Sequence, residues 1–180
     1  MMIRRNNRWI GMGLILIFLV AGSASALVEI SKKAEVRADQ DDIDAILDTF
    51  DQAEESLQAE NLSVIMSVYS DGYLNRGLRK EETSRIWQDI FKRYDRLSSR
   101  HLFSRIVVDP NGKTAKVTCT GSLFGVSVFK GGARSEAVQI DTWFEAIHHL
   151  AFEEGEWRII GHDPSEKERD LFGSAIHLLF

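Results

Sequence analysis

Residues 136–152 read EAVQIDTWFEAIHHLAF, and apolar side chains recur at every second position along most of this run. That period is typical of a β-strand, in which alternate residues point to opposite faces of a sheet. We expect the inward face to carry Val138, Ile140, Thr142, Phe144, Ala146, His148, Leu150 and Phe152. The outward face then carries Gln139, Asp141, Trp143, Glu145, Ile147 and His149, unless a β-bulge shifts the alternation.

Turn sequences on both sides of this strand predict a succession of hairpins. They are Asp109-Pro110-Asn111-Gly112, Gly131-Gly132 and Glu153-Glu154-Gly155. These turns separate four expected strands, at Arg100–Asp109, Thr114–Val128, Glu136–Phe152 and Glu156–His162. Gly121 and Gly125 lie inside the second strand and predict bulges or bends that curl the sheet.

Helices are expected before the strands. Apolar residues recur at helical spacing from Asp41 to Leu57, again in a short segment from Leu62 to Tyr69, and again from Glu81 to Leu97. Helices followed by a run of hairpins indicate an α+β domain, with the helices packed on one face of an antiparallel sheet.

The segments that flank this domain have their own signals. Leu27 to Gln40 is polar and aperiodic, so we expect residues 27–40 to be a linker and the domain to cover residues 41–163. Pro164 ends the sheet, and Ser165 and Glu168 match a capping box. Residues 164–180 are therefore predicted to form a C-terminal amphipathic helix.

The first residues have the pattern of an export signal. A cationic start with Arg4, Arg5 and Arg8 precedes an apolar run, and Ala24-Ser25-Ala26 supplies the small side chains of a cleavage site. We expect a signal peptide over residues 1–26, and a periplasmic or secreted protein. The alternative is an uncleaved membrane anchor, because the uncharged stretch over residues 9–28 is long enough to span a bilayer.

Charge and cysteine content exclude several classes of function. Loss of residues 1–26 removes three arginines and no acid, so the formal net charge falls from −5 to about −8. An acidic chain is a poor partner for nucleic acid or for an anionic membrane surface. Cys119 is the single cysteine, which rules out an internal disulfide and a cysteine metal site. We expect no metal and no cofactor.

Three motifs in a fixed order resemble the NTF2-like superfamily, also described as SnoaL-like or cystatin-like α+β cones. They are LSVIMSVYSD at residues 62–71, the helix after Lys80-Glu81-Glu82, and GEWRI at residues 155–159. The resemblance covers about Asp41 to Asp163. It implies a curved sheet wrapped around helices with an apolar pocket in the cone, and it does not fix an activity, because the superfamily contains isomerases, dehydratases, hydrolases and binding modules.

The resemblance also permits a test for ketosteroid-isomerase chemistry. That branch uses a tyrosine on the first helix and an aspartate base after the second, and further requires an acid on a central strand. Matched on residues 62–71, the tyrosine position falls on Ala53 and the base on Gly77, and neither side chain can perform the role. The isomerase residues are therefore absent, which favours a protein that is not an enzyme.

His148 is the candidate for chemistry, because it places an ionisable imidazole on the expected apolar face. A buried histidine has a lowered pKa and can act as a general base, although a hydrogen-bonded core histidine is the simpler interpretation. Cys119 is expected to face inward as a small buried side chain. Pocket or core positions are expected for eight residues: Tyr69, Tyr73, Trp87, Phe91, Cys119, Phe144, His148 and Trp157.

Large apolar side chains on the expected outer face predict that this face is covered. Phe124, Val126, Trp143 and Ile147 lie there, so we expect a homodimer through the sheet or packing of the C-terminal helix. The sequence thus predicts an exported, noncatalytic module that binds a small apolar molecule or a protein. The alternative is a small-molecule isomerase, dehydratase or hydrolase that uses a cone pocket around His148, with Asp141 or Tyr73.

Overall fold

The computed structural model describes residues 28–128 and 137–164. Its main sheet has the strand order β1-β4-β5-β6-β7, and a small hairpin pairs β2 with β3. The strands are β1 (Val28–Arg37), β2 (Leu74–Asn75), β3 (Leu78–Arg79), β4 (Tyr94–Val108), β5 (Thr114–Ser127), β6 (Ala137–Glu153) and β7 (Glu156–Asp163). The helices are α1 (Gln40–Gln58), α2 (Leu62–Ser67) and α3 (Lys80–Arg93).

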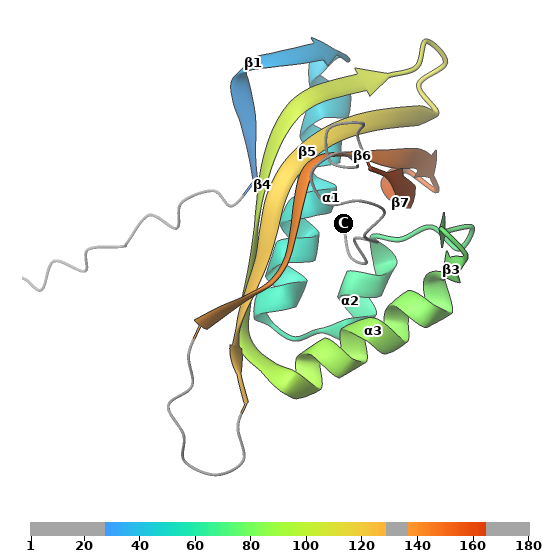
Figure 1. Ribbon diagram of the computed structural model, residues 1–180. Helices are drawn as coiled ribbons and strands as arrows, with labels where there is room; N and C mark the ends of the chain where they lie inside the picture. The colour runs from blue at the N-terminus through green and yellow to red at the C-terminus, as the bar shows by residue number, and fades with distance from the viewer. Residues whose placement is uncertain (1–27, 129–136, 165–180) are drawn as a thin grey trace, which may run out of the picture.

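The helices lie on one side of a strongly bent sheet (Figure 1). Strands β4, β5, β6 and β7 pair antiparallel in chain order, as the hairpin turns predict. The expected α+β cone, with N-terminal helices packed on a curved antiparallel sheet, is confirmed for the residues described.

Four of the register shifts in the sheet lie where β4 and β6 pair with β5, and they contribute to its bend. Ser104 is an extra residue on β4, and the pairing of β4 with β5 also shifts between Asp95 and Ser98. On β6 the pairing shifts opposite Thr120 and again next to Ile140. The bulges therefore lie on β4 and β6, on either side of the β5 glycines that were expected to carry them. Extra residues on a strand increase its local twist and bend, so β4 and β6, the two neighbours of β5, curl around it.

The bulge opposite Thr120 changes which β6 residues face the helices. Glu145 has a positive φ of 51°, and Trp143 rather than Phe144 is buried. Ala146, His148 and Leu150 are buried as expected. The prediction that Trp143 faces outward is wrong, because the inserted residue shifts the alternation by one position between Trp143 and Ala146.

Gly121 is required where Trp143 crosses β5. A methyl group on Gly121 would lie 2.4 Å from Cζ2 of Trp143 and 2.3 Å from the carbonyl oxygen of Arg100. Only a residue without a side chain leaves room for the indole ring and the neighbouring strand together.

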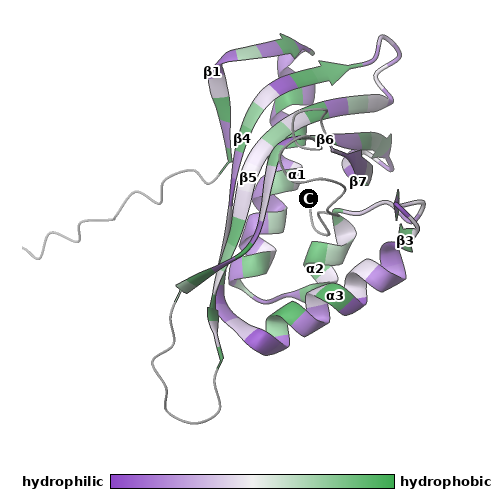
Figure 2. Cartoon of the chain, viewed as in Figure 1, coloured by the Kyte–Doolittle hydropathy of each residue, from purple (hydrophilic) through white to green (hydrophobic). Residues whose placement is uncertain are grey.

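The helices follow their sequence signals, with one boundary error. The Asp39 side chain caps α1 by accepting a hydrogen bond from the amide of Asp42, and Asn61 caps α2 in the same way. Polar and apolar residues alternate along α1 and α3 (Figure 2), whose apolar faces enter the core. Helix α3 ends at Arg93 rather than at Leu97, because the chain is already extended at Tyr94, which pairs with Ser127.

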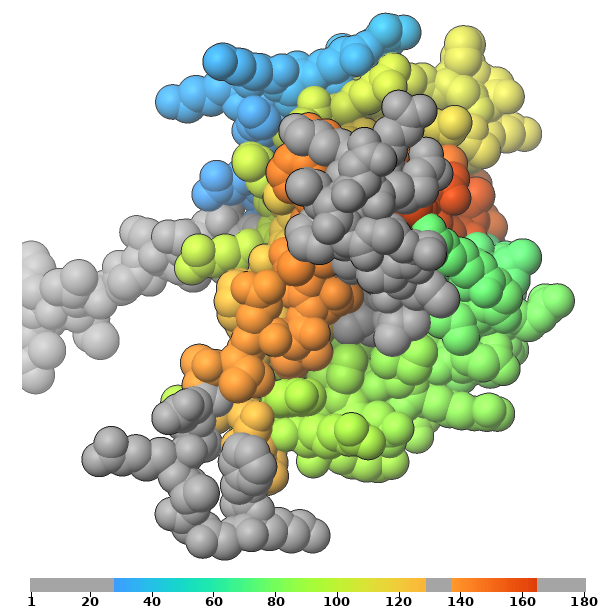
Figure 3. Space-filling view, in the orientation of Figure 1, coloured from blue at the N-terminus to red at the C-terminus, as the bar shows by residue number. Residues whose placement is uncertain are grey.

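Residues 28–37 were expected to be part of a linker and instead form an edge strand. Strand β1 pairs parallel with β4, with Val28 opposite His101, and its register shifts between Ile30 and Glu35. It protrudes at one corner of the molecule (Figure 3). Its charged side chains interrupt the apolar alternation by which a strand is predicted from sequence. Charge on an edge strand is a common protection against unwanted pairing.

Some predictions fall on residues outside the described ranges. These are the signal peptide or anchor, the Gly131-Gly132 turn and the C-terminal helix at residues 165–180. Among the helices of the described ranges, none is long and apolar enough to cross a membrane.

Substitution of Gly121 by alanine tests the close approach of Trp143. Overpacking of this kind costs roughly 1–3 kcal/mol, so we expect the free energy of unfolding in urea to fall by about that amount. Gly72→Ala is the matched control, since the nearest atom to its added methyl is Ser70 Oγ at 3.5 Å. A Gly121→Ala protein as stable as Gly72→Ala would contradict this packing.

Candidate functional site

The interior of the cone contains an unusual number of buried polar side chains. Those that are at most 6% exposed include Glu54, Ser99, His101, Cys119, His148 and His162, with Tyr69, Tyr73 and Asn75 nearby in the fold. Buried polar groups are costly unless they are hydrogen-bonded, so their partners define what this interior can do.

Glu54 joins helix α1 to strand β4. Its Oε2 atom accepts hydrogen bonds from the Ser99 amide at 2.7 Å and from the Ser99 hydroxyl at 2.6 Å. Its other oxygen accepts from the side chain of Gln58 at 3.0 Å. Three donors therefore surround a carboxylate that is 4% exposed.

The network continues from Ser99 across the sheet. Ser99 Oγ lies 3.0 Å from His101 Nε2, and His101 Nδ1 lies 3.5 Å from the Cys119 sulfur. Trp143 donates its indole N–H to the same sulfur at 3.3 Å. The chain Glu54–Ser99–His101–Cys119–Trp143, named here the interior chain, thus links α1, β4, β5 and β6.

The hydroxyl of Ser99 determines the direction of these hydrogen bonds. Its single hydrogen is donated to Glu54, so the 3.0 Å contact with His101 requires His101 Nε2 to be the donor. A neutral imidazole then carries no hydrogen on Nδ1, which accepts from Cys119. The thiol hydrogen has a second acceptor, the Thr120 carbonyl oxygen, also at 3.5 Å.

Burial holds four titratable groups of this interior in their neutral forms. It lowers the pKa of His101 to about 3 and raises the pKa of the Cys119 thiol to about 12, against a smaller opposing effect of the Trp143 hydrogen bond. Burial also raises the pKa of Tyr73 to about 12 and that of Tyr69 well above its usual value. At neutral pH the two tyrosines, the thiol and the imidazole of His101 are therefore uncharged.

His148 belongs to a second group of polar residues at the β6–β7 end of the cone. It is completely buried and pairs across the strands with His162, whose ring centroid lies 5.9 Å away. Asn75 contacts His162 Nε2 at 3.1 Å. The ring of Phe50 lies between the two groups, 5.7 Å from His148 and 5.3 Å from His101.

The expected aromatic positions separate into a cluster and two outliers. Trp87 donates its indole N–H to the Tyr69 hydroxyl at 3.1 Å, and the Tyr69 and Tyr73 rings meet edge to face. Phe91 is half-buried against Trp87. Phe144 follows Trp143 and is not part of the buried core, and Trp157 packs against Phe152 at the far end of β6.

Sequence reasoning missed Glu54, Ser99 and His101. The signal was present, because Glu54 follows Phe50 by four residues on the apolar face of α1, and Ser99, His101 and Phe103 alternate on one face of β4. Nothing in the sequence showed that these two faces would meet.

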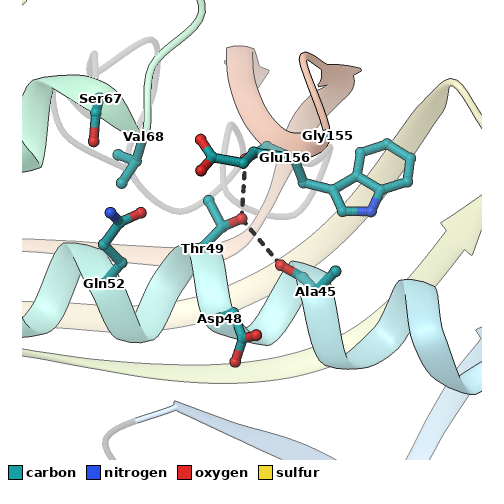
Figure 4. A pocket seen from close by; sticks show the side chains of 9 residues that line it. Ala45, Asp48, Thr49, Gln52, Ser67, Val68, Gly155 and Glu156 are labelled. Carbon is teal, nitrogen blue, oxygen red and sulfur yellow. Dashed lines mark hydrogen bonds between the residues drawn. The ribbon is translucent and has the colours of Figure 1, made fainter.

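A separate pocket of about 320 Å³ opens on the outside of the cone. Helix α1 forms one wall, and the end of α2 and the β6–β7 turn form the others (Figure 4). Its lining residues are Ala45, Asp48, Thr49, Gln52, Ser67, Val68, Gly155, Glu156 and Trp157. Of the expected pocket residues, this pocket includes Trp157 alone.

Comparison with known proteins gives the fold a name. No family model matches the sequence, and no curated protein matches it significantly. Solved structures do match. A proposed dehydratase of the NTF2-like family from Streptomyces avermitilis is 12% identical, with a TM-score of 0.50 over 69% of this chain and 95% of that one. The fold is NTF2-like.

Two further solved structures match with higher TM-scores at similarly low identity. A proposed aromatic ring hydroxylase from Novosphingobium aromaticivorans is 13% identical, with a TM-score of 0.55 over 70% of this chain and 89% of that one. A conserved protein from Planctomyces limnophilus is 17% identical, with a TM-score of 0.56 over 69% and 94% of the two chains.

The stability of this NTF2-like cone should depend on pH through His101. The unfolded chain binds a proton below the ordinary histidine pKa of 6.5, whereas the folded chain resists protonation down to about 3. Stability contributed by neutral His101 is therefore lost as the pH falls from 6.5 toward 3, by up to about 1.4 kcal/mol per pH unit.

His101→Gln removes this titration, so its free energy of unfolding in urea should fall less steeply than that of the wild type between pH 6.5 and 4.5. Between pH 7 and 8 the difference between the two proteins should be constant, because His101 is neutral in both folded and unfolded states. Parallel curves across the acidic range would show that His101 is not buried as described.

Proposed function

We propose that the chain is an exported NTF2-like domain that binds a small apolar molecule or a protein partner without transforming it. The observation that carries the proposal is the hydrogen-bonded state of the interior chain, in which the His101 imidazole and the Cys119 thiol are neutral and the Glu54 carboxylate is held by three donors. Each polar side chain of the interior chain is hydrogen-bonded to another member of the chain. We therefore regard these side chains as a fixed polar part of the interior and not as reactive groups.

The pKa values of the interior argue against acid–base catalysis there. An effective general base has a pKa near the working pH, whereas that of His101 is about 3. A nucleophilic cysteine needs a lowered pKa, whereas that of Cys119 is about 12. His148, which the enzyme alternative places at a pocket wall, is completely buried beside Phe50 and His162, and neither Asp141 nor Tyr73 is its cross-strand partner.

We place the ligand of this proposal on partly buried apolar side chains of α3 and β6. Ile86 and Phe91 on α3, with Tyr94 and Ile140, pack against the core but keep part of their surface open. Apolar walls with a few fixed polar groups are typical of small-molecule sites. The similar structures include one proposed aromatic ring hydroxylase and one proposed dehydratase of the NTF2-like family, which supports a cone that admits small molecules.

Dimerisation through the sheet stays a prediction. Its support is weaker than the sequence indicated, because one of the four apolar side chains expected on the outer face is buried in the core. Trp143 enters the core, which leaves Phe124, Val126 and Ile147 as half-buried apolar side chains of the expected outer set.

Export rests on the N-terminal pattern. Strand β1 begins at Val28, two residues after the expected cleavage site at Ala26, so a mature chain starting at Leu27 keeps the whole strand.

The binding proposal is tested with the full chain, expressed with its leader and purified from the periplasm. Titration with the neutral fluorophore N-phenyl-1-naphthylamine should give saturable fluorescence. Phe91→Ala should weaken this binding at least fivefold, because it removes a half-buried wall of the site. The intact mass of the same preparation should equal that of a chain that begins at Leu27.

Phe152→Ala is the matched control, since Phe152 is 44% exposed and packs on Trp157 away from α3. Absence of saturation, or equal weakening by both variants, would overturn a ligand site between α3 and β6. Rapid reaction of Cys119 with a disulfide reagent at pH 7 would contradict the noncatalytic interior, and a full-length mass would contradict cleavage.

A further inference from the structure

We propose that the outer pocket, lined by α1, the end of α2 and the β6–β7 turn, is a second binding site, and that it takes a small organic amine. The site is independent of the ligand proposed for the cone, because the two share no residue. It follows from the shape, the polar groups and the charge of the pocket.

The pocket has the size and lining of a small-molecule site. Its volume of about 320 Å³ lies at the lower end of the range usual for such sites. Ala45 and Val68 give apolar surface, while the side chains of Gln52, Ser67 and Glu156 are exposed to solvent at its rim. In Figure 4, Gln52 and Glu156 extend from opposite walls toward the hollow, and the Asp48 carboxylate points away from it.

The floor of the pocket is rigid. The Thr49 hydroxyl lies 2.9 Å from the Trp157 carbonyl oxygen and 3.1 Å from that of Ala45, which ties α1 to β7 directly below the hollow. The Ser70 amide donates to the Ile159 carbonyl oxygen at 3.0 Å, and the Ile159 amide donates to that of Val68 at 2.8 Å. The three walls therefore keep their spacing without a ligand, which lowers the entropic cost of binding.

The charge around the pocket selects a cation. Helix α1 carries seven acidic residues and no lysine or arginine. Burial, and after it the negative charges of Asp48, Glu55 and Glu54, raise the pKa of Asp51, the residue that precedes Gln52 on this helix. Arg158 forms ion pairs with both Glu154, at 3.2 Å, and Glu156, at 3.6 Å, so an amine at the pocket would share the Glu156 carboxylate with this arginine.

An ammonium group fits this arrangement better than a metal ion. The pocket offers one inward carboxylate, an amide and a hydroxyl, spread over a hollow far larger than a cation. Across both described ranges, no group of three or more His, Cys, Asp or Glu side chains is placed to hold a metal. An amine would set its charge on Glu156 and its polar end against Gln52 and Ser67.

The test is a titration of the purified domain with putrescine at low ionic strength, followed by calorimetry and by amide chemical shifts. We expect saturable binding, with shifts confined to residues around Gln52, Ser67 and Gly155. Glu156→Gln should raise the Kd at least tenfold. The uncharged analogue 1,4-butanediol should not bind, and 0.5 M salt, which screens charge strongly, should weaken binding.

Glu154→Gln is the matched control, because Glu154 occupies the same turn and also contacts Arg158 but does not line the pocket. It should change the Kd less than twofold. Equal effects of the two variants, or shifts spread along the whole of α1, would overturn a defined site in favour of diffuse attraction to an acidic surface. Binding of butanediol as tightly as putrescine would overturn the selection for an amine.

Discussion

Glu54 places a carboxylate inside the cone, where water does not solvate it, and the surrounding structure must replace that water. An isolated buried carboxylate costs several kcal/mol, so the donors around it are a requirement of the fold. Ser99 supplies both its amide and its hydroxyl to one oxygen, and Gln58 supplies its side chain to the other. Because Ser99 has only one hydroxyl hydrogen, this single contact also fixes the direction of every hydrogen bond that follows it through His101 to Cys119.

The bent sheet makes this contact possible. Bulges on β4 and β6 curl these two strands around β5, and the missing side chain of Gly121 leaves room for the indole of Trp143, which donates to Cys119. Phe50 then fills the centre, with its ring against His101, Phe103 and His148. The same curvature therefore closes the apolar core and links polar side chains on β4, β5 and β6 in one chain that ends at Glu54 on α1.

The strands, the helices and their order could be predicted from the sequence, because periodicity and turn chemistry are local. The face on which each β6 residue lies could not be predicted, because the bulge opposite Thr120 forms in the pairing of β6 with β5. Trp143 was therefore placed on the wrong face. Strand β1 was missed because its pairing with β4 is non-local and its side chains are charged. His148 and Cys119 were expected inside and lie inside, but their partners were not predictable. The Glu54–Ser99 contact joins residues 45 positions apart, and no local pattern encodes that meeting.

The interior chain holds a neutral imidazole and a neutral thiol in fixed hydrogen bonds where a related fold could carry reactive groups, and this is the physical basis for a binding role. Nitrogen NMR of the His101 imidazole at pH 7 tests it most directly, with the signals assigned by their loss in His101→Gln. The structure requires a neutral ring with its hydrogen on Nε2 and none on Nδ1, unchanged down to pH 5. A ring protonated on Nδ1, or one that becomes charged near pH 6.5, would contradict the directed chain and with it the neutral interior.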